Sequence, residues 1–273
     1  MKFLHSRVLA NTLIIALGVF TLSCGNDEEP EPDTNSEKAT LRLRIENIDN
    51  NDLPIELNKD YITENGDTLQ ITALQYFLSN VVLMDDDGGM QILPESYYLI
   101  KTTSESSETI VEISGLETGN YTSIHFGFGV DSSANHTSAT DEGDLDPLGA
   151  DGMIWNWDSG YKFLKLEGNF RTDTTTNGSF SFHVGGDANY KAYKLGAESE
   201  EHMEHMKTSS LNLSLESGKT REVHLKASIL NIFDHPNLID LDVTNQAHGS
   251  TAQNLAENYG TDLFEVHHTL LED

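Results

Sequence analysis

The feature that most constrains this chain is an alternation of apolar and polar side chains that begins at Ala39. In the first such run, Leu41, Leu43 and Ile45 alternate with charged residues. A period of two places the apolar side chains on one face of a β-strand and the charged ones on the other. Comparable strand-like runs follow at residues 76–84, 97–101, 109–113, 124–130, 161–167, 180–184, 211–215 and 223–229. Many short strands without alternating helices predict an all-β fold, an antiparallel β-sandwich or barrel-like domain.

One segment near the end of the sequence has helical spacing instead. Leu255 and Tyr259 fall on one helix face, and Ser250 or Thr251 offers an N-cap. No internal repeat and no second domain is visible, and 273 residues suit one domain with targeting segments. We therefore expect a single β domain over residues 39–273 with a short C-terminal helix.

Residues 1–23 have the features of a bacterial lipoprotein signal peptide. Lys2 and Arg7 precede an apolar stretch, residues 13–20, that is too short to span a bilayer. The segment ends in small residues before Cys24, which resembles a lipobox, so we expect cleavage there and lipidation of the thiol. Since this is the one cysteine of the chain, an internal disulfide and a four-cysteine metal site are excluded.

The segment after the cysteine, residues 24–38, is predicted to be an acidic flexible tether. It is rich in acidic, polar and proline residues and has too few apolar side chains to form a core. Acidic stretches directly behind a lipidated cysteine resemble the surface-export signals of Bacteroidetes lipoproteins. This resemblance implies an outer membrane lipoprotein that is exposed at the cell surface and attached to the membrane by its lipid anchor.

The charge balance excludes several classes of partner. The chain has 45 acidic and 16 basic residues, a formal net charge of -29. Such a chain repels phosphate backbones, so no nucleic acid is expected as a partner. The P-loop, dinucleotide-binding, serine-hydrolase and zinc-protease motifs are also missing from the sequence. We therefore expect a protein that is not an enzyme and has no catalytic residues.

The placement of certain histidines suggests metal ligands. His183 lies between Phe182 and Val184 in a strand-like run, and His224 lies in a second run of the same kind. Both imidazoles should thus point away from the apolar face of their strand. Imidazole is the commonest metal ligand in proteins, although an isolated surface histidine usually has no such role.

Other histidines leave two interpretations open. His202 and His205, with two neighbouring methionines, offer soft ligands that suit Cu(I), but their surroundings favour a solvated loop. His248, His267 and His268 either fold back beside the sheet or lie at the surface near the end of the sequence.

Trp155 and Trp157 are the two tryptophans of the sequence. At strand spacing they share a face, and in a loop they can line a pocket. Composition alone favours a role in filling or capping the core.

Several segments together resemble the MbnP-like family of copper-binding proteins. The most specific is W-x-W-x-x-G-Y-K-F within residues 153–168, and further matching segments are residues 77–80, 94–98, 128–130, 182–185 and 224–233. The resemblance extends from about Thr40 to the C-terminus. It implies a secreted or lipidated β-rich domain that binds one copper ion through histidines and a tryptophan oxidised to kynurenine. It also implies a partner, a dihaem relative of the bacterial cytochrome c peroxidases, that carries out the oxidation.

The same resemblance implies which residues form the site. Trp155 or Trp157 is the residue to be oxidised, and His183, His224 and His248 are candidate copper ligands. Opening the indole ring converts a nitrogen that only donates into an amine that can bind a metal. The expected function is copper acquisition or handling at the cell envelope. The alternative is a non-metal adhesion or glycan-binding sandwich in which the tryptophan pair is a stacking platform.

We predict that Cys24→Ser yields a soluble, folded domain. The tether carries no core residues, so loss of the lipid should change the location of the protein and leave its stability unchanged. Membrane fractionation and the melting temperature of the purified variant check this. A misfolded variant would show that the cysteine has a structural role.

Overall fold

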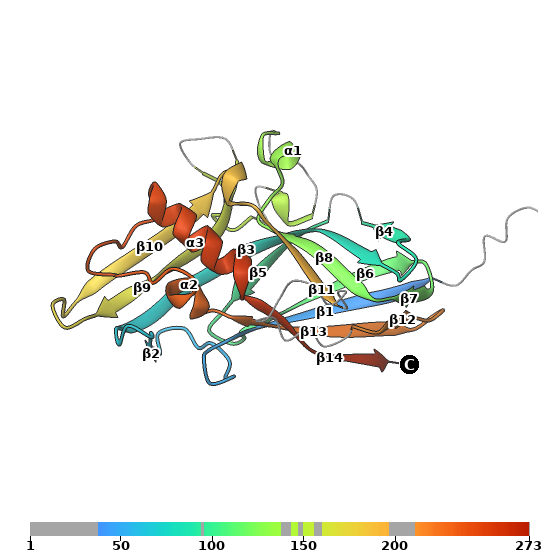
Figure 1. Ribbon diagram of the computed structural model, residues 1–273, viewed down its shortest axis with the longest axis horizontal. Coiled ribbons are helices and arrows are strands. Elements are labelled where there is room, and N and C mark those ends of the chain that lie inside the picture. The colour runs from blue at the N-terminus through green and yellow to red at the C-terminus, as the bar shows by residue number, and fades with distance from the viewer. Residues whose placement is uncertain are drawn as a thin grey trace, which may run out of the picture. The chain divides into compact units, whose positions relative to one another are not determined.

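Among the described residues, two large β-sheets pack face to face across an apolar core in the computed structural model (Figure 1). The structure describes residues 38–93, 96–137, 143–146, 150–155, 160–196 and 211–272. All of them lie in the unit Glu37–Asp273. The predicted signal peptide, Cys24 and all of the tether except residue 38 lie outside the described residues.

The smaller sheet has the strand order β14-β13-β1-β6. Its strands are β1 (Ala39–Ile48), β6 (Glu108–Leu116), β13 (Thr220–Ser228) and β14 (Phe264–Glu272). As the alternation predicts, Leu41, Leu43 and Ile45 of β1 are buried in the core while the residues between them face outward. The β1–β13 pair is parallel, whereas the neighbouring pairs are antiparallel.

The larger sheet has the order β10-β9-β3-β8-β11, with β2, β4 and β5 also paired to β3. Its strands are β2 (Asp60–Ile62), β3 (Thr68–Met84), β4 (Met90–Ile92), β5 (Tyr97–Thr102), β8 (Ser123–Phe128), β9 (Lys162–Arg171), β10 (Gly178–Gly185) and β11 (Lys191–Gly196). β3 has 17 residues and two register irregularities, which bend a strand and increase its twist. The sheet therefore curls around the core. A small separate sheet pairs β7 (Gly119–Tyr121) with β12 (Leu213–Leu215).

The helices are short. They are α1 (Ser132–Asn135), α2 (Asn231–Asp234) and α3 (Ser250–Thr261), with the 3-10 turns η1 (Gly143–Leu145) and η2 (Asp187–Asn189). Here α2 packs against α3, and α3 lies beside β10 (Figure 1). α3 is the predicted C-terminal helix. It buries Leu255 and Tyr259 completely, but its N-cap is Gly249 and not a hydroxyl residue. Within the described part of the chain, no helix is long and apolar enough to cross a membrane.

The all-β prediction is confirmed, although the short strands β2, β4, β7 and β11 lie outside the predicted runs. Two further differences concern the end of the sequence. β14 follows α3 and was not among the predicted runs, because its apolar and polar residues do not alternate cleanly. β13 pairs with β1 in parallel, which an antiparallel fold does not foresee. Both differences arise from long-range pairing, in which β13 becomes the inner strand between β1 and β14.

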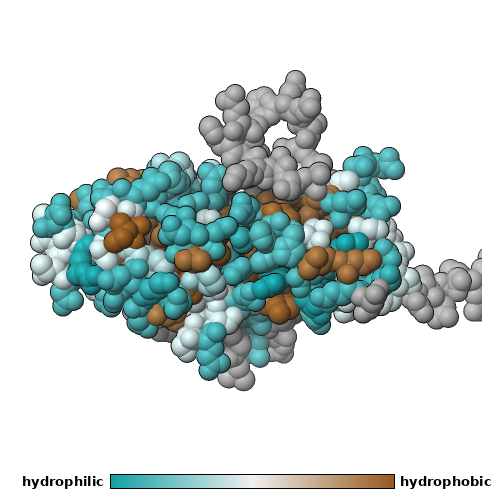
Figure 2. Space-filling model, turned by 90° about the horizontal axis from the view of Figure 1, so that it is seen from below, coloured by the Kyte–Doolittle hydropathy of each residue, from teal (hydrophilic) through white to brown (hydrophobic). Residues whose placement is uncertain are grey.

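The face of the molecule in Figure 2 is mainly hydrophilic. Its hydrophobic residues lie singly or in small groups among hydrophilic ones (Figure 2).

Stacked aromatic rings join the larger sheet to α3. The ring of Phe128 stacks on Tyr76, with centroids 5.0 Å apart, and on Tyr259, with centroids 4.1 Å apart. All three side chains are fully buried. Stacked aromatic pairs contribute beyond the area that they bury, so Phe128 holds α3 against the sheet.

We expect Phe128→Ala to lower the free energy of unfolding by about 3–5 kcal/mol, the usual cost of emptying a large aromatic site in a core. Urea unfolding measures this change. Ile110→Ala is the control, since that side chain is 56% exposed on β6 and should change stability by no more than about 0.5 kcal/mol. Equal effects of the two substitutions would contradict the role of Phe128.

Candidate metal centre

A second, smaller apolar core lies on the outer side of the larger sheet and supports the tryptophan segment. Phe77 and Phe163 neighbour Tyr76 and Leu164 on their strands and so point away from the main core. Loop residues cover them; the buried members of this second core are Phe77, Tyr97, Val130, Leu145, Ala150, Met153, Tyr161 and Phe163. The described segments on either side of residues 156–159 are thus held in place by apolar contacts.

The base of the tryptophan loop is a short antiparallel ladder. Lys162 N donates to Met153 O at 2.6 Å, and Trp155 N donates to Gly160 O at 3.2 Å. Residues 156–159, which include Trp157, lie outside the described residues. The structure therefore places Trp155 at the root of the loop.

The indole of Trp155 is half-buried and held from several sides. Its Nε1 donates to Tyr161 O at 3.1 Å. The Lys162 ammonium lies 5.3 Å from the ring centroid, a cation–π distance. Burial, followed by the charge of Lys165, lowers the pKa of Lys162. Hence one face of this ring is covered by the lysine.

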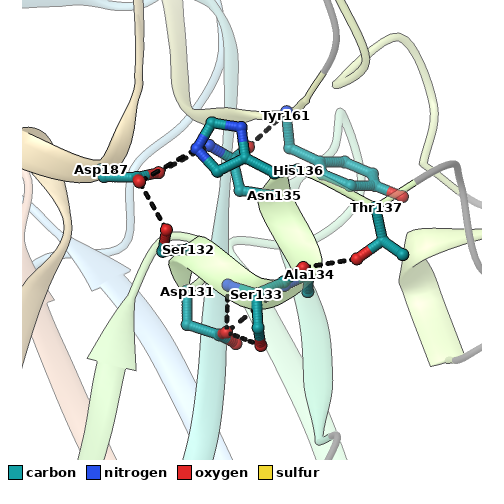
Figure 3. Close-up of polar contacts among 9 residues, drawn as sticks. All are labelled: Asp131, Ser132, Ser133, Ala134, Asn135, His136, Thr137, Tyr161 and Asp187. Carbon is teal, nitrogen blue, oxygen red and sulfur yellow. Dashed lines mark hydrogen bonds and ion pairs between the residues drawn. The ribbon is translucent and has the colours of Figure 1, made fainter.

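A polar network behind the loop positions Tyr161 (Figure 3). Asn135 Oδ1 accepts from Tyr161 N at 2.9 Å, and its Nδ2 donates to Asp187 Oδ1 at 3.1 Å. Hydrogen bonds from Ser132, Asn135 and His136 hold the pKa of Asp187 below its usual range. Gly160 has no room for a side chain, because a Cβ there would lie 2.6 Å from Asn135 Oδ1. The buried Asn135 thus connects α1, η2 and the tryptophan loop.

Three of the predicted site residues line one pocket of about 330 Å³. Trp155, His183 and His248 surround it, together with Ser181, Gly185, Gln246, Ala247 and Ala252. The segment before α3 reaches β10 through a hydrogen bond of 2.9 Å from Ser181 N to Asn245 O and a bridge between Ser181 and Gln246. The Trp155 and His183 ring centroids are 6.1 Å apart. Three distant segments of sequence therefore converge there.

His183 points away from the main core, as predicted, while Phe182 and Val184 are buried in it. Its Nε2 lies 2.6 Å from Glu167 Oε1 on β9. With Nε2–H donating to the carboxylate, Nδ1 carries the free lone pair. A carboxylate that orients an imidazole in this way is the usual outer partner of a metal-binding histidine.

The structure places His224 elsewhere, although the resemblance implies it for the same ligand set. It lies on β13 of the smaller sheet and also points away from the main core. The main core separates the outward face of β13 from the outward face of β10. His183 and His224 therefore lie on opposite sides of the sandwich.

His224 instead meets His267 and His268 of β14. One ring nitrogen from each of the three side chains lies within 4.8 Å of the others. The ladder pairs His224 with His268 and Leu225 with Val266, so His267 is the extra residue of a β-bulge. A bulge sets two consecutive residues of one strand opposite one residue of its partner. Adjacent residues of a regular strand would point to opposite faces, and the sequence did not predict this group.

His224 is 4% exposed, and its ring nitrogens lack well-aligned hydrogen-bond partners among the described residues. Its Nε2 lies 3.0 Å from Glu46 Oε2, an ion-pair distance, yet the geometry makes neither ring nitrogen a hydrogen-bond partner within the described residues. A hydrogen bond requires alignment as well as distance, so this contact does not satisfy the imidazole. Burial, then Arg44 and the two neighbouring histidines, lowers the pKa of His224 to about 4. The imidazole is therefore neutral at pH 7.

The remaining predicted residues, His202 and His205, lie outside the described residues, as Cys24 and Trp157 do.

A protein-family model matches most of the chain. The model of the MbnP family matches residues 38–254 of the chain. The solved structure of MbnP from Methylosinus trichosporium is similar at 12% identity and a TM-score of 0.48, covering 74% of this chain and 80% of that chain. Among curated proteins, no sequence matches the chain.

We predict that Asn135→Ala destabilises the domain by about 1–3 kcal/mol, because the buried Tyr161 N–H and the Asp187 carboxylate lose a partner. Chemical denaturation measures the loss, and hydrogen exchange should show faster opening of the Tyr161 amide. Asn120→Ala is the matched control, since Asn120 is exposed on β7. If both variants are as stable as the wild type, the asparagine does not support the tryptophan loop.

Proposed function

We propose, from the premise that the chain belongs to the MbnP family, that it binds one copper ion in the Trp155 pocket. The association of this family with copper supports a copper-related role. His183 is the central ligand, and His248 and the residue at position 155 complete the site. The observation that carries this proposal is the convergence of Trp155, His183 and His248 on one pocket.

The chemistry of the pocket suits copper. When Nε2–H of His183 donates to Glu167, Nδ1 is the nitrogen whose lone pair can bind a metal. Imidazole is a good ligand for copper in both oxidation states. His248 is exposed at the pocket rim, so its side chain has freedom to rotate toward an ion. Glu167 also supplies a negative charge that offsets the charge of the metal.

Trp155 is the tryptophan that we propose for conversion to kynurenine. An unmodified indole nitrogen only donates, and in this structure it donates to Tyr161 O. Ring opening supplies an aniline-type amine beside His183. The oxidant belongs to the proposed dihaem peroxidase-like partner, and the domain itself serves as the binding protein.

The proposed location follows from the leader segment. A lipid on Cys24 and an acidic tether would hold the domain at the outer membrane, facing outward. In that position the protein would acquire or handle copper at the cell envelope.

The environment of Trp155 favours this function over a glycan-binding platform. A stacking platform needs well-exposed rings, but Trp155 is half-buried and Lys162 covers one of its faces. The ring edge lies next to an imidazole, which is what a metal site with a modified tryptophan requires.

We predict that His183→Ala lowers the affinity of the pocket for copper by more than about 100-fold, and that Glu167→Gln lowers it by about 10–100-fold, the usual cost of losing an outer partner. The side chain of His183 is 28% exposed, so its loss opens no core cavity and the metal-free protein should keep its melting temperature. Copper titration against a competing chelator measures both affinities.

His235→Ala is the matched control, because that exposed histidine pairs with Glu64 outside the pocket. The double variant His202→Ala and His205→Ala should also retain the copper. Loss of copper in the double variant with retention in His183→Ala would assign the ion to the His/Met segment and overturn the pocket. Peptide mass spectrometry of protein from its native host tests the modification of Trp155.

A further inference from the structure

We propose that His224, His267 and His268 form a second metal site, separate from the Trp155 pocket, for one borderline divalent transition-metal ion, Cu²⁺ or Zn²⁺. This inference does not rest on the proposed copper pocket. It concerns the opposite outer face of the sandwich and a different set of side chains.

The first step is the geometry of the three imidazoles. The bulge in β14 brings His267 and His268 to the side of the sheet on which His224 lies. Their ring centroids are 4.9 to 5.2 Å apart in all three pairs, and every ring is steeply inclined to its neighbours. Three nitrogens bound to one ion at about 2.0–2.1 Å would lie roughly 3.3–3.6 Å apart. Since the nitrogens are already within 4.8 Å, small side-chain rotations close the site.

The second step is the unsatisfied side chain at its base. His224 is the buried member of the group, and neither ring nitrogen makes a hydrogen bond within the described residues. A buried polar group without a partner is costly to the folded state. An ion held between the three rings would satisfy this nitrogen, while the exposed His267 provides access from solvent.

The third step is the charge around the group. The cations of this sheet face are paired: Arg42 with Glu112 and Glu272, Arg44 with Glu108, and Lys226 with Asp52. Among the described residues, the Glu46 carboxylate lies beside this group, with Oε2 3.0 Å from His224 Nε2. A cation held by the three imidazoles would therefore have a carboxylate next to it. The formal net charge of -29 for the whole chain adds a general attraction for cations.

The fourth step is the donor set, which selects the class of ion. Three imidazole ligands suit Zn²⁺ and Cu²⁺ and offer little to Ca²⁺ or Mg²⁺, which require oxygen ligands. Three protein ligands also leave a coordination position open for water or a small ligand. Under the usual order of stability, Cu²⁺ binds such a site more tightly than Zn²⁺.

The test uses the full chain and Zn²⁺ alone, with Cu²⁺ and Co²⁺ as further probes. His267→Ala and His268→Ala are the informative variants, because neither side chain is buried and both proteins should fold. Each should lower the Zn²⁺ affinity of this site by about 10–100-fold or more. Loss of an outer partner already costs about that much, and these substitutions remove a ligand itself. Intense visible absorption by bound Co²⁺ would report four-coordinate geometry in the wild type and should vanish in both variants.

Matched variants separate this site from the pocket. His235→Ala and the double variant His202→Ala and His205→Ala should retain the Zn²⁺ site, and so should His183→Ala. If His267→Ala and His268→Ala bind Zn²⁺ as the wild type does, or if the wild type binds none, this proposal is wrong whatever the pocket does. If only His183→Ala loses copper, the result supports the Trp155 pocket and not this site. If only the two β14 variants lose copper, it supports this site and not the pocket.

Discussion

Burial of the inward faces of the two large sheets against each other is the interaction on which the other features depend. Leu41, Leu43 and Ile45 of one sheet and Phe182 and Val184 of the other belong to the same core. Each fully buried side chain of this kind stabilises the fold by about 1.5–3 kcal/mol. Because side chains alternate along a strand, this burial directs the residues between them outward on both sides of the molecule. His183 and His224 are separated for this reason, and one ion cannot bind both.

The candidate sites form where the regular pattern is interrupted. The bulge in β14 brings two consecutive histidines to one face. On the other side, Gly185 ends β10, and a Cβ there would lie 2.5 Å from Tyr161 O and 3.0 Å from Trp155 Nε1. The missing side chain allows the tryptophan segment to lie against the strand. An uninterrupted ladder would provide neither arrangement, and irregularities of this kind commonly occur next to functional sites.

Carboxylates have different roles on the two faces. Glu167 orients His183 through a short hydrogen bond, whereas Glu46 lies beside His224 without the alignment of one. Exposed ion pairs contribute little to stability, about 0–1 kcal/mol each. Their main effect on the smaller sheet is to neutralise its arginines, so that the histidines do not face unpaired positive charge. The acidic composition of the chain is thus compatible with cation binding on both sides.

The sequence by itself determined the fold class, the positions of most strands, the C-terminal helix and the outward direction of His183 and His224, because these follow from a local period of two or of 3.6 residues. The W-x-W-x-x-G-Y-K-F segment, through its resemblance, also pointed to the MbnP family, which the family model matches. The sequence could not predict which residues each histidine contacts. Pairing of β13 with β14, the bulge at His267 and the approach of residues 245–248 to β10 join segments far apart in the chain. Such contacts depend on long-range registry and packing, about which a local sequence pattern carries no information. Only the tertiary structure therefore decided which histidines lie together.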